Sequence, residues 1–565
     1  MRFRTPLFLL ALLFVLVTAC SSPSGCPTCG TTKNGAFALI NVIPVPEHNP
    51  TGTPGGPFVS FDISVVDPVN HLFYVSDRIG LDVVVVDTIK NVAIATIDGA
   101  NSVAQAGNNA SSCVSTIPPL QSALATGTTD HFTRFGCRTG SFSVPPFGAN
   151  GLFGGFTGAQ CCAARANGVN PLSCPCGIVV TADGKTMFVG NASSTVVVFD
   201  LTTTPPTVIA NIPTGQSPDF DGPVGVAPCI ASAQGRALSD PTCGDMRADE
   251  MSYDEKDKIL LVTNGDPGLP FATLIDMSAV VARTGNCLPV NPANPYSPTN
   301  FPTCILGQIY YDGAPINNIN VPVDDTLSNP PATNQLPCPD PSTTAPSGVS
   351  GTGKGAGGKN VPCHHGPFIA SLGTTAISPA GLGGSTFNPN TGHFLVTNGN
   401  ATADLTIGTV DEIDPRIGNP NGPVVVNSFT MKNCMPTSIV QGPGNQFLVG
   451  CADHDGVAFP PNEYVIDGKT GAILATITTV GGVDETWFNP GDGNYYLAAR
   501  DMPNGPVLGV IDSKTNTWLQ NVTTNTNSHS VAVDPSNNHV FVPLQAGPIC
   551  TTQSSNGCIG VYARQ

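Results

Sequence analysis

The sequence predicts an all-β protein: a seven-bladed β-propeller closed by an N-terminal strand, with long disulfide-rich loop insertions. Three observations support this prediction. A strand-forming repeat occurs seven times, the last copies are about 45 residues apart, and a spare strand precedes the first copy. That interval lies within the range of one four-stranded propeller blade, and strand-type patterning at this period is typical of propellers.

Each copy of the repeat begins with a turn containing Asp, Asn, Pro or Gly and continues as a short apolar strand. The seven copies occupy residues 67–75, 183–189, 254–262, 388–396, 442–449, 489–497 and 534–542. A second apolar strand follows, as in 83–87, and then an outer strand, as in 92–97. Apolar runs bounded by turn residues are strand signals, because the turn residues let the chain reverse.

The two ends of the chain supply an independent argument for a closed ring. The seventh copy has only three strands before Gln565, whereas residues 36–43 form a strand with no blade of its own. Pairing this strand into the last blade would remove the unpaired edges that an open sheet exposes. We therefore expect seven blades within residues 36–565.

Some copies carry variants of the tetrapeptide Tyr-Val-Thr-Asn, and the chain resembles the YVTN-type β-propeller repeat proteins in this respect. The variants are Tyr74-Val75-Ser76-Asp77, Leu261-Val262-Thr263-Asn264 and Leu395-Val396-Thr397-Asn398. The resemblance covers most of residues 36–565 and implies the propeller fold. It does not choose among cell-surface proteins, binding proteins and enzymes, since one fold supports many functions.

The start of the chain predicts a bacterial lipoprotein. Arg2 and Arg4 form a short basic region, an apolar stretch follows, and Val17-Thr18-Ala19-Cys20 matches a lipoprotein cleavage site. We expect a signal peptide over 1–19, a lipidated tether over 20–35 and the propeller over 36–565. The serines after Cys20 resemble the sorting signal of enteric outer-membrane lipoproteins, so the predicted location is the cell envelope, anchored to the membrane by acyl chains.

The composition narrows the set of partners. The formal net charge is −17, and only 11% of the residues are charged. Nucleic acids require a cationic surface, so we expect no nucleic acid partner. An acidic protein is compatible with cationic ligands or metal ions.

The chain has 19 cysteines, which leaves an even number once Cys20 is set aside. An even count in an exported protein predicts disulfides. The pairs suggested by spacing are Cys434–Cys451, Cys550–Cys558, Cys287–Cys304, Cys229–Cys243, Cys338–Cys363 and Cys113–Cys137. Cys161, Cys162, Cys174 and Cys176 would supply two more bridges of undetermined connectivity. Two motifs have metal alternatives, Cys26-Pro27-Thr28-Cys29 and Cys363-His364-His365, although a loop disulfide is the preferred interpretation of both.

Three insertions interrupt the repeats, at about 98–173, 215–247 and 283–380. They are rich in Ser, Thr, Gly, Pro and Asn, and they contain most of the cysteines. Loops of this length in a compact fold are usually functional or disordered, and disulfides would order them. We expect them to cover one face of the ring and to bind a protein, a glycan or a small ligand.

Acidic side chains recur just before the repeated turns, where the innermost strands of a propeller begin. Aligning the seven copies places Asp62, Asp249, Glu250, Asp484, Glu485 and His529 near one end of the channel. Converging carboxylates can hold a divalent ion such as calcium, and His529 would also suit a borderline metal. Three interpretations stay open: polar residues lining a wet channel, a structural ion, or a catalytic metal.

The arrangement also resembles the gluconolactonase type of six-bladed propeller, in which acidic and amide side chains hold a metal at the channel mouth. That resemblance implies a metal that activates a lactone or ester toward water. This chain departs from the family in blade number and insertions. The first functional prediction is therefore an envelope-anchored binding or scaffold module, and the alternative is a metal-dependent hydrolase or lactonase.

Overall fold

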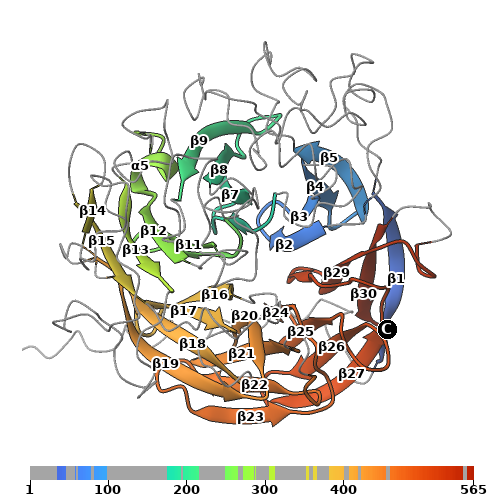
Figure 1. Ribbon diagram of the computed structural model, residues 1–565. Coiled ribbons are helices and arrows are strands. Elements are labelled where there is room, and N and C mark those ends of the chain that lie inside the picture. The colour runs from blue at the N-terminus through green and yellow to red at the C-terminus, as the bar shows by residue number, and fades with distance from the viewer. Residues whose placement is uncertain are drawn as a thin grey trace, which may run out of the picture.

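The computed structural model of the protein describes most of the repeated segments. The described residues are 35–45, 58, 61–77, 82–97, 175–191, 195–214, 248–264, 271–285, 287, 304–311, 352–354, 360–365, 381–399, 406–415, 417, 422–453, 458–550 and 557–565. They form seven β-sheets arranged in a ring around a central axis (Figure 1). The predicted seven-bladed propeller is therefore confirmed.

The blades follow one another along the chain, and each begins with its innermost strand. The first blade contains β2 (Phe61–Asp67), β3 (Leu72–Asp77), β4 (Asp82–Asp87) and β5 (Val92–Ile97), and the second contains β6 (Ile178–Val180), β7 (Thr186–Asn191), β8 (Thr195–Asp200) and β9 (Thr207–Pro213). The third contains β10 (Met251–Asp254), β11 (Ile259–Asn264), β12 (Phe271–Asp276) and β13 (Ile305–Tyr310). The fourth contains β16 (Leu382–Asn388), β17 (His393–Asn398), β18 (Ile407–Asp414) and β19 (Val424–Lys432).

The last three blades have the same antiparallel order. The fifth blade contains β20 (Met435–Gln441), β21 (Gln446–Ala452), β22 (Glu463–Asp467) and β23 (Ile473–Ile477). The sixth contains β24 (Glu485–Asn489), β25 (Asn494–Ala499), β26 (Val507–Asp512) and β27 (Thr517–Thr523). The seventh contains β28 (Ala532–Asp534), β29 (His539–Leu544), β30 (Cys558–Arg564) and β1 (Phe37–Pro44).

The N-terminal strand closes the ring, as predicted. β1 pairs antiparallel with β30, from Phe37 opposite Arg564 to Pro44 opposite Cys558. Gln520 of the sixth blade also holds β1: its Oε1 accepts the Phe37 backbone N–H at 2.8 Å and its Nε2 donates to the Phe37 carbonyl at 2.9 Å. The last blade is thus completed by residues from both ends of the described chain.

The described residues form a hydrophobic core between neighbouring blades, in seven clusters. The continuous valine run of β4 illustrates this arrangement, because its side chains reach the core on both faces of the blade. Val84 and Val86 pack toward the seventh blade, whereas Val83 and Val85 pack toward the second. Because both faces of the sheet are buried, the strand is apolar throughout instead of alternating, as in other sheets covered on both faces.

The Asp and Asn residues of the repeat stabilise its turns. In the first turn of a blade, Asp67 Oδ1 accepts the backbone N–H of Val69 at 2.9 Å, and Asp254, Asn388, Asn489 and Asp534 make the equivalent bond two residues on. A side chain that accepts a backbone N–H in this way favours a tight turn. This chemistry accounts for the conspicuous repeat in the sequence.

The segment 283–380, which we assigned to an insertion, contributes to the third blade. Its β13 is the outer strand of that blade, and β15 (Asn360–His365) and β14 (Thr352–Lys354) extend the sheet to six strands. The short helix α5 (Ser278–Val281) lies just before it. Within the described ranges, no helix is long and apolar enough to cross a membrane.

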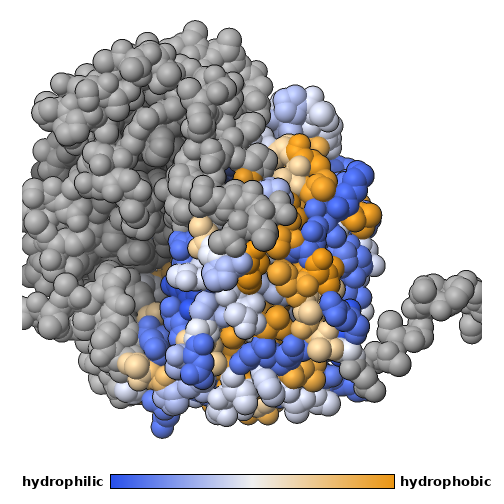
Figure 2. Space-filling view, turned by 90° about the vertical axis from the view of Figure 1, so that its right-hand side faces the viewer, coloured by the Kyte–Doolittle hydropathy of each residue, from blue (hydrophilic) through white to orange (hydrophobic). Residues whose placement is uncertain are grey.

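The outer rim of the ring has a mixed surface (Figure 2). Outer strands expose some large apolar side chains, including Ile94 on β5 and Ile473 on β23, which are 52% and 50% exposed. Hydrophilic residues lie among the apolar ones in the view of Figure 2. Single exposed apolar residues of this kind are normal on the surface of folded proteins.

Candidate ligand site in the axial channel

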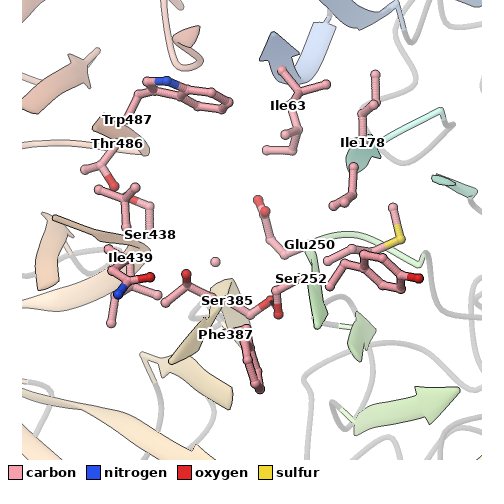
Figure 3. A pocket seen from close by; sticks show the side chains of 18 of the residues that line it. Ile63, Ile178, Glu250, Ser252, Ser385, Phe387, Ser438, Ile439, Thr486 and Trp487 are labelled. Carbon is pink, nitrogen blue, oxygen red and sulfur yellow. Dashed lines mark hydrogen bonds between the residues drawn. The ribbon is translucent and has the colours of Figure 1, made fainter. Parts of the chain in front are cut away.

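A cavity of about 510 Å³ lies on the axis of the ring. It is lined by residues from the innermost strands β2, β6, β10, β16, β20 and β24, and by Val531 beside β28. All seven blades therefore contribute to its wall, and Figure 3 shows their side chains converging on the space. Because innermost strands surround a propeller's axis, this cavity is the axial channel.

The wall of the cavity combines apolar side chains with hydroxyl groups. The apolar residues include Ile63, Ile178, Met251, Phe387 and Trp487, and the hydroxyl residues include Ser64, Ser252, Ser385, Ser438 and Thr486. Two hydroxyl pairs join neighbouring blades: Ser385 Oγ donates to Ser252 Oγ at 2.9 Å, and Ser64 Oγ lies 2.9 Å from Ser530 Oγ. These bonds fix the spacing of the inner strands around the cavity.

Two glutamates give the cavity an acidic side. Glu250 precedes β10, Glu485 begins β24, and Figure 3 shows Glu250 pointing into the space. Their carboxyl groups hydrogen-bond to each other. Burial raises the pKa of both well above the usual value, and the charge of Asp249 raises that of Glu250 further. Two carboxyl groups so close cannot both ionise easily, so a proton shared between them is favoured over the loss of both protons.

Three aspartates and one arginine surround this pair. The charges of Asp62, Asp249 and Asp484 all add to the rise in the pKa of Glu250. Arg500 offsets part of this charge: its Nη1 lies 2.8 Å from Asp484 Oδ2, and its Nε donates to Asp501 at 3.2 Å. The charge of Asp484 in turn raises the pKa of Arg500.

His529 is buried beside Asp62 and faces oxygen atoms on both sides. Its Nε2 lies 2.9 Å from the Phe61 carbonyl and 3.8 Å from Asp62 Oδ1, and its Nδ1 lies 2.9 Å from the Asn527 carbonyl. The ring also stacks on Phe61 with centroids 4.9 Å apart. Both ring nitrogens therefore lie within hydrogen-bonding distance of backbone carbonyl oxygens.

The structure brings the predicted site residues into one neighbourhood. The charges of Asp62, Asp249 and Asp484 act on Glu250, which also hydrogen-bonds to Glu485. His529 lies beside Asp62. That proximity follows from their shared position at the start of the innermost strands. Whether they bind a metal stays a prediction.

A divalent cation would find only part of a binding site here. Carboxylate oxygens of Asp62 and Asp249 and the sulfur of Cys176 all lie within 4.8 Å of one another. Cys176, however, is disulfide-bonded, so its sulfur is no thiolate ligand. The two aspartates fit a hard, oxygen-preferring ion such as calcium, which would need further oxygen ligands.

Two important residues of the site escaped the sequence reasoning. Arg500 lies just after β25, and the pairing of Glu485 with Ala498 puts Asp484 beside it. Counting the register across this hairpin would have found the ion pair. Trp487 lies two residues beyond Glu485 on β24 and lines the cavity. It is one of two tryptophans in the chain, and its place on the same strand as Glu485 is the sequence signal that could have identified it.

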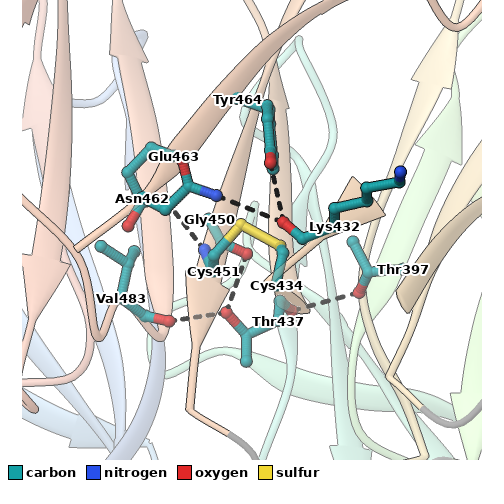
Figure 4. Close-up of a disulfide and its surroundings, with 10 residues drawn as sticks. All are labelled: Thr397, Lys432, Cys434, Thr437, Gly450, Cys451, Asn462, Glu463, Tyr464 and Val483. Carbon is teal, nitrogen blue, oxygen red and sulfur yellow. Dashed lines mark hydrogen bonds between the residues drawn. A yellow bond between two sulfur atoms is a disulfide. The ribbon is translucent and has the colours of Figure 1, made fainter. Parts of the chain in front are cut away.

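Among the described residues, three of the expected disulfides have both of their cysteines placed, and all three belong to the blades or their edges. They are Cys434–Cys451, Cys550–Cys558 and Cys287–Cys304. Cys434–Cys451 joins the chain before β20 to β21, and Figure 4 shows Glu463 beside it. The Glu463 Oε2 accepts the backbone N–H of Cys451 at 2.8 Å.

Several predictions fall on residues outside the described ranges. They include the lipidation site Cys20 and the cysteines Cys113, Cys137, Cys229, Cys243 and Cys338. Cys363 and the following histidines belong to β15, which is described only through its backbone. Their disulfide or metal assignments stay predictions.

Neither family models nor curated proteins match this chain. Among solved structures, a chain of Kuenenia stuttgartiensis hydrazine synthase is 13% identical, with a TM-score of 0.44, over 90% of this chain and 96% of its own length. A chain of a mitotic checkpoint complex is 8% identical, with a TM-score of 0.42, over 100% and 99%. Likenesses this distant assign neither a family nor a function.

Proposed function

We propose that this protein is a binding module of the bacterial cell envelope whose ligand lies in the axial channel. One observation carries the proposal: a cavity of about 510 Å³ on which all seven blades converge. Small-molecule sites are typically concave and mostly apolar, with a few polar groups that orient the ligand. Trp487 and the isoleucines supply the apolar wall, and Glu250 and Glu485 supply the polar groups.

A pair of matched variants tests binding in the channel. Ile63 lines the cavity, so Ile63→Trp should fill part of it, whereas Ile473→Trp changes an exposed side chain on an outer strand. Small molecules would be screened for those that raise the melting temperature of the purified protein. Hits should keep their effect on Ile473→Trp and lose it on Ile63→Trp, and hits that ignore Ile63→Trp would place binding elsewhere.

The envelope part of the proposal rests on the N-terminal sequence, above all on Cys20 after Val17-Thr18-Ala19. Acylation there would anchor the propeller to a membrane without a spanning helix. In a bacterial host, radiolabelled palmitate should label the wild-type protein and leave Cys20→Ala unlabelled. Equal labelling of both would remove the anchor from the proposal. Ligand recognition by the long insertions also stays part of the proposal, as a second contact surface.

A metal-dependent hydrolase is the second candidate, and the convergence of carboxylates favours it. Asp62 and Asp249 would hold the ion, and the neighbouring Glu250–Glu485 pair could take a proton from water. A bound divalent ion would polarise an ester or lactone carbonyl. The protein should then contain a near-stoichiometric metal and hydrolyse lactones or esters, with the activity lost in Glu250→Gln. Elemental analysis that finds no metal in folded protein purified without chelators would eliminate this candidate.

A further inference from the structure

We propose that the axial cavity selects a ligand with a protonated amine on an apolar body, and that Glu250 and Glu485 bind the amine. The inference rests on the proposed binding function and adds the charge and shape of the ligand. It follows from three properties of the cavity: its charge, its hydroxyl groups without hydrogen-bond partners, and its apolar wall.

The charge around the cavity is negative. Five carboxyl groups gather there: Asp62, Asp249, Glu250, Asp484 and Glu485. Arg500 forms ion pairs with Asp484 and Asp501, and His529 lies beside Asp62. Even if both glutamates are protonated and both Arg500 and His529 carry a positive charge, the three aspartates leave the group with a net negative charge, which complements a cationic ligand.

Two buried hydroxyl groups beside the glutamates offer further hydrogen-bonding capacity. Ser438 and Thr486 line the cavity from the neighbouring strands β20 and β24, and they are only 2% and 6% exposed. Within the described part of the chain, Ser438 Oγ and Thr486 Oγ1 have no hydrogen-bond partner. A buried polar group without a partner is costly, so a ligand donor would gain a hydrogen bond if either side chain turned its hydroxyl toward the cavity.

An ammonium group matches these acceptors. It has three N–H donors and no acceptor, so it can donate to a carboxylate of the Glu250–Glu485 pair and to a hydroxyl that turns toward it. A carboxylate ligand would instead meet like charge. A neutral alcohol could satisfy a hydroxyl but would gain no charge-assisted bond.

The rest of the wall favours an apolar body on the ligand. Ile63 and Ile178 lie across the cavity from Trp487 in Figure 3. Their burial against an alkyl or aromatic group would be favourable. The indole face of Trp487 can also attract a nearby cation.

Tryptophan fluorescence gives a direct measurement, because the chain has only two tryptophans. Trp518 lies on the outer strand β27 and is 41% exposed, so Trp518→Phe leaves Trp487 as the single reporter in the cavity. This variant would be titrated with three probes of equal length: hexylammonium, 1-hexanol and hexanoate. Calorimetry on the unmodified protein would give the affinities independently.

We expect hexylammonium to shift the Trp487 emission and to bind at least about tenfold more tightly than hexanol, with hexanoate weakest. Glu250→Gln/Glu485→Gln should abolish the preference for the cation while leaving hexanol binding unchanged. The matched control, Asp512→Asn, removes a carboxylate from a turn on the rim and should leave all three affinities unchanged.

The outcomes separate this inference from the proposed function. If hexanol binds as tightly as hexylammonium and both are lost in Ile63→Trp, the cavity binds ligands but does not select cations, and the inference is overturned alone. If no probe binds, although circular dichroism shows the variant to be folded, both are overturned. If a cation preference survives the double glutamine variant, the preference arises elsewhere and the assignment to Glu250 and Glu485 is wrong.

Discussion

Carboxylates occupy two regions of this propeller, the turns between strands and the start of the inner strands, and they behave in opposite ways. At the turns, hydrogen bonds and salt links lower the pKa: the side chain of Lys90 does so for Asp87, and Arg283 brings the pKa of Asp200 to about 2. At the channel, burial and neighbouring acids raise the pKa of Glu250 and Glu485. The same functional group is therefore stabilised as an anion in one region and destabilised in the other.

The difference separates architecture from function. Turn carboxylates or amides recur in most blades because each turn needs an acceptor for its backbone N–H groups. Channel acids occur only in the first, third and sixth blades, and the corresponding positions elsewhere hold residues such as Gly383 and Gly384. Since the other blades form without an acid there, the fold does not require the acidic cluster. Residues that cost stability and are not needed by the fold are reasonable candidates for a site.

The largest effect should come from breaking a turn carboxylate that also joins two blades. Asp534 is fully buried, accepts the backbone N–H of Ser536 at 2.9 Å, and binds Thr88 and His71 of the first blade. Asp534→Ala removes all three bonds and deprives the buried Thr88 hydroxyl of this acceptor, whereas His71 keeps Ser536 Oγ at 3.2 Å. We expect a loss of about 3 kcal/mol in the free energy of unfolding, measured by urea denaturation.

Asp467→Ala is the matched control for this variant. Asp467 also caps a turn, through Lys469 and Thr470 of its own turn, but those bonds do not reach another blade. Its loss should cost about 1 kcal/mol. Equal costs for the two variants would mean that joining the first and last blades adds nothing to stability.

The second effect concerns the pH dependence of the channel acids. An acid with a raised pKa in the folded state binds its proton more tightly there than in the unfolded chain. Stability is therefore full below the unfolded-state pKa and falls as the pH rises from that value through the folded-state pKa. The slope reaches about 1.4 kcal/mol per pH unit for each proton. The free energy of unfolding of the wild type should fall between about pH 5 and 8. In Glu250→Gln/Glu485→Gln this fall should be smaller by roughly 2 kcal/mol.

Single variants test whether the two glutamates act as a pair. Removing Glu250 also removes two causes of the raised pKa of Glu485, its charge and its hydrogen bond, so the two single substitutions should be strongly non-additive. Additive changes in the pH slope would show that burial alone raises both pKa values and that the shared proton plays no part.

Glu463 provides an isolated carboxyl for comparison and a smaller effect. It is fully buried beside the Cys434–Cys451 disulfide, and burial raises its pKa well above the usual value. Its Oε2 accepts the Cys451 N–H, whereas Oε1 has no hydrogen-bond partner within the described ranges. Glu463→Gln keeps the acceptor and removes the titration. It should match the wild type near pH 5 and exceed it by about 1 kcal/mol at pH 8.

Combining Glu463→Gln with Glu485→Gln tests whether the two carboxyl groups affect stability independently. Glu463 does not figure among the main influences on Glu250 or Glu485. Its contribution should therefore add to that of Glu485→Gln within about 0.5 kcal/mol. A large coupling in urea denaturation at pH 8 would indicate that the channel and the disulfide region respond together.

Sequence reasoning predicted the fold well because its signals are local and repeated. Turn residues such as Asp67 and apolar runs such as Val83–Val86 appear in recognisable form in blade after blade, and each signal arises from contacts within a few residues. The ring closure by β1 also followed from counting strands. The outer strand β13 was missed because it comes after the unrepeated segment between Ala282 and Cys304, so the spacing of the repeat gave no guidance.

The site was only partly predictable, because it depends on contacts between distant segments. Alignment of the copies gathered the acids at one end of the channel, since equivalent strand positions lie at equivalent heights. It could not show that Glu250 and Glu485 share a hydrogen bond, that Arg500 neutralises Asp484, or that Cys176 is disulfide-bonded. Those facts depend on side-chain direction across the ring, for which no local pattern exists.

The smallest predicted effect concerns a carboxylate paired with a base. His393 Nδ1 lies 2.8 Å from Glu412 Oε1, and this hydrogen bond raises the pKa of His393. Its contribution to stability is thus present below the unfolded-state pKa and is lost as the pH rises through the folded-state value. His393→Gln should cost about 0.5 kcal/mol at pH 5.5 and almost nothing at pH 8.5.

This pair completes the contrast between the two kinds of carboxylate environment. Asn427 Nδ2 also donates to Glu412, at 2.6 Å, so Glu412 keeps a partner when His393 is replaced and the cost stays small. Its pH dependence has the same sign as that of the channel glutamates, but it arises from a base that gains a proton beside an anion. Urea denaturation at the two pH values measures the difference. An identical cost at both would mean that His393 contributes through packing and not through its charge.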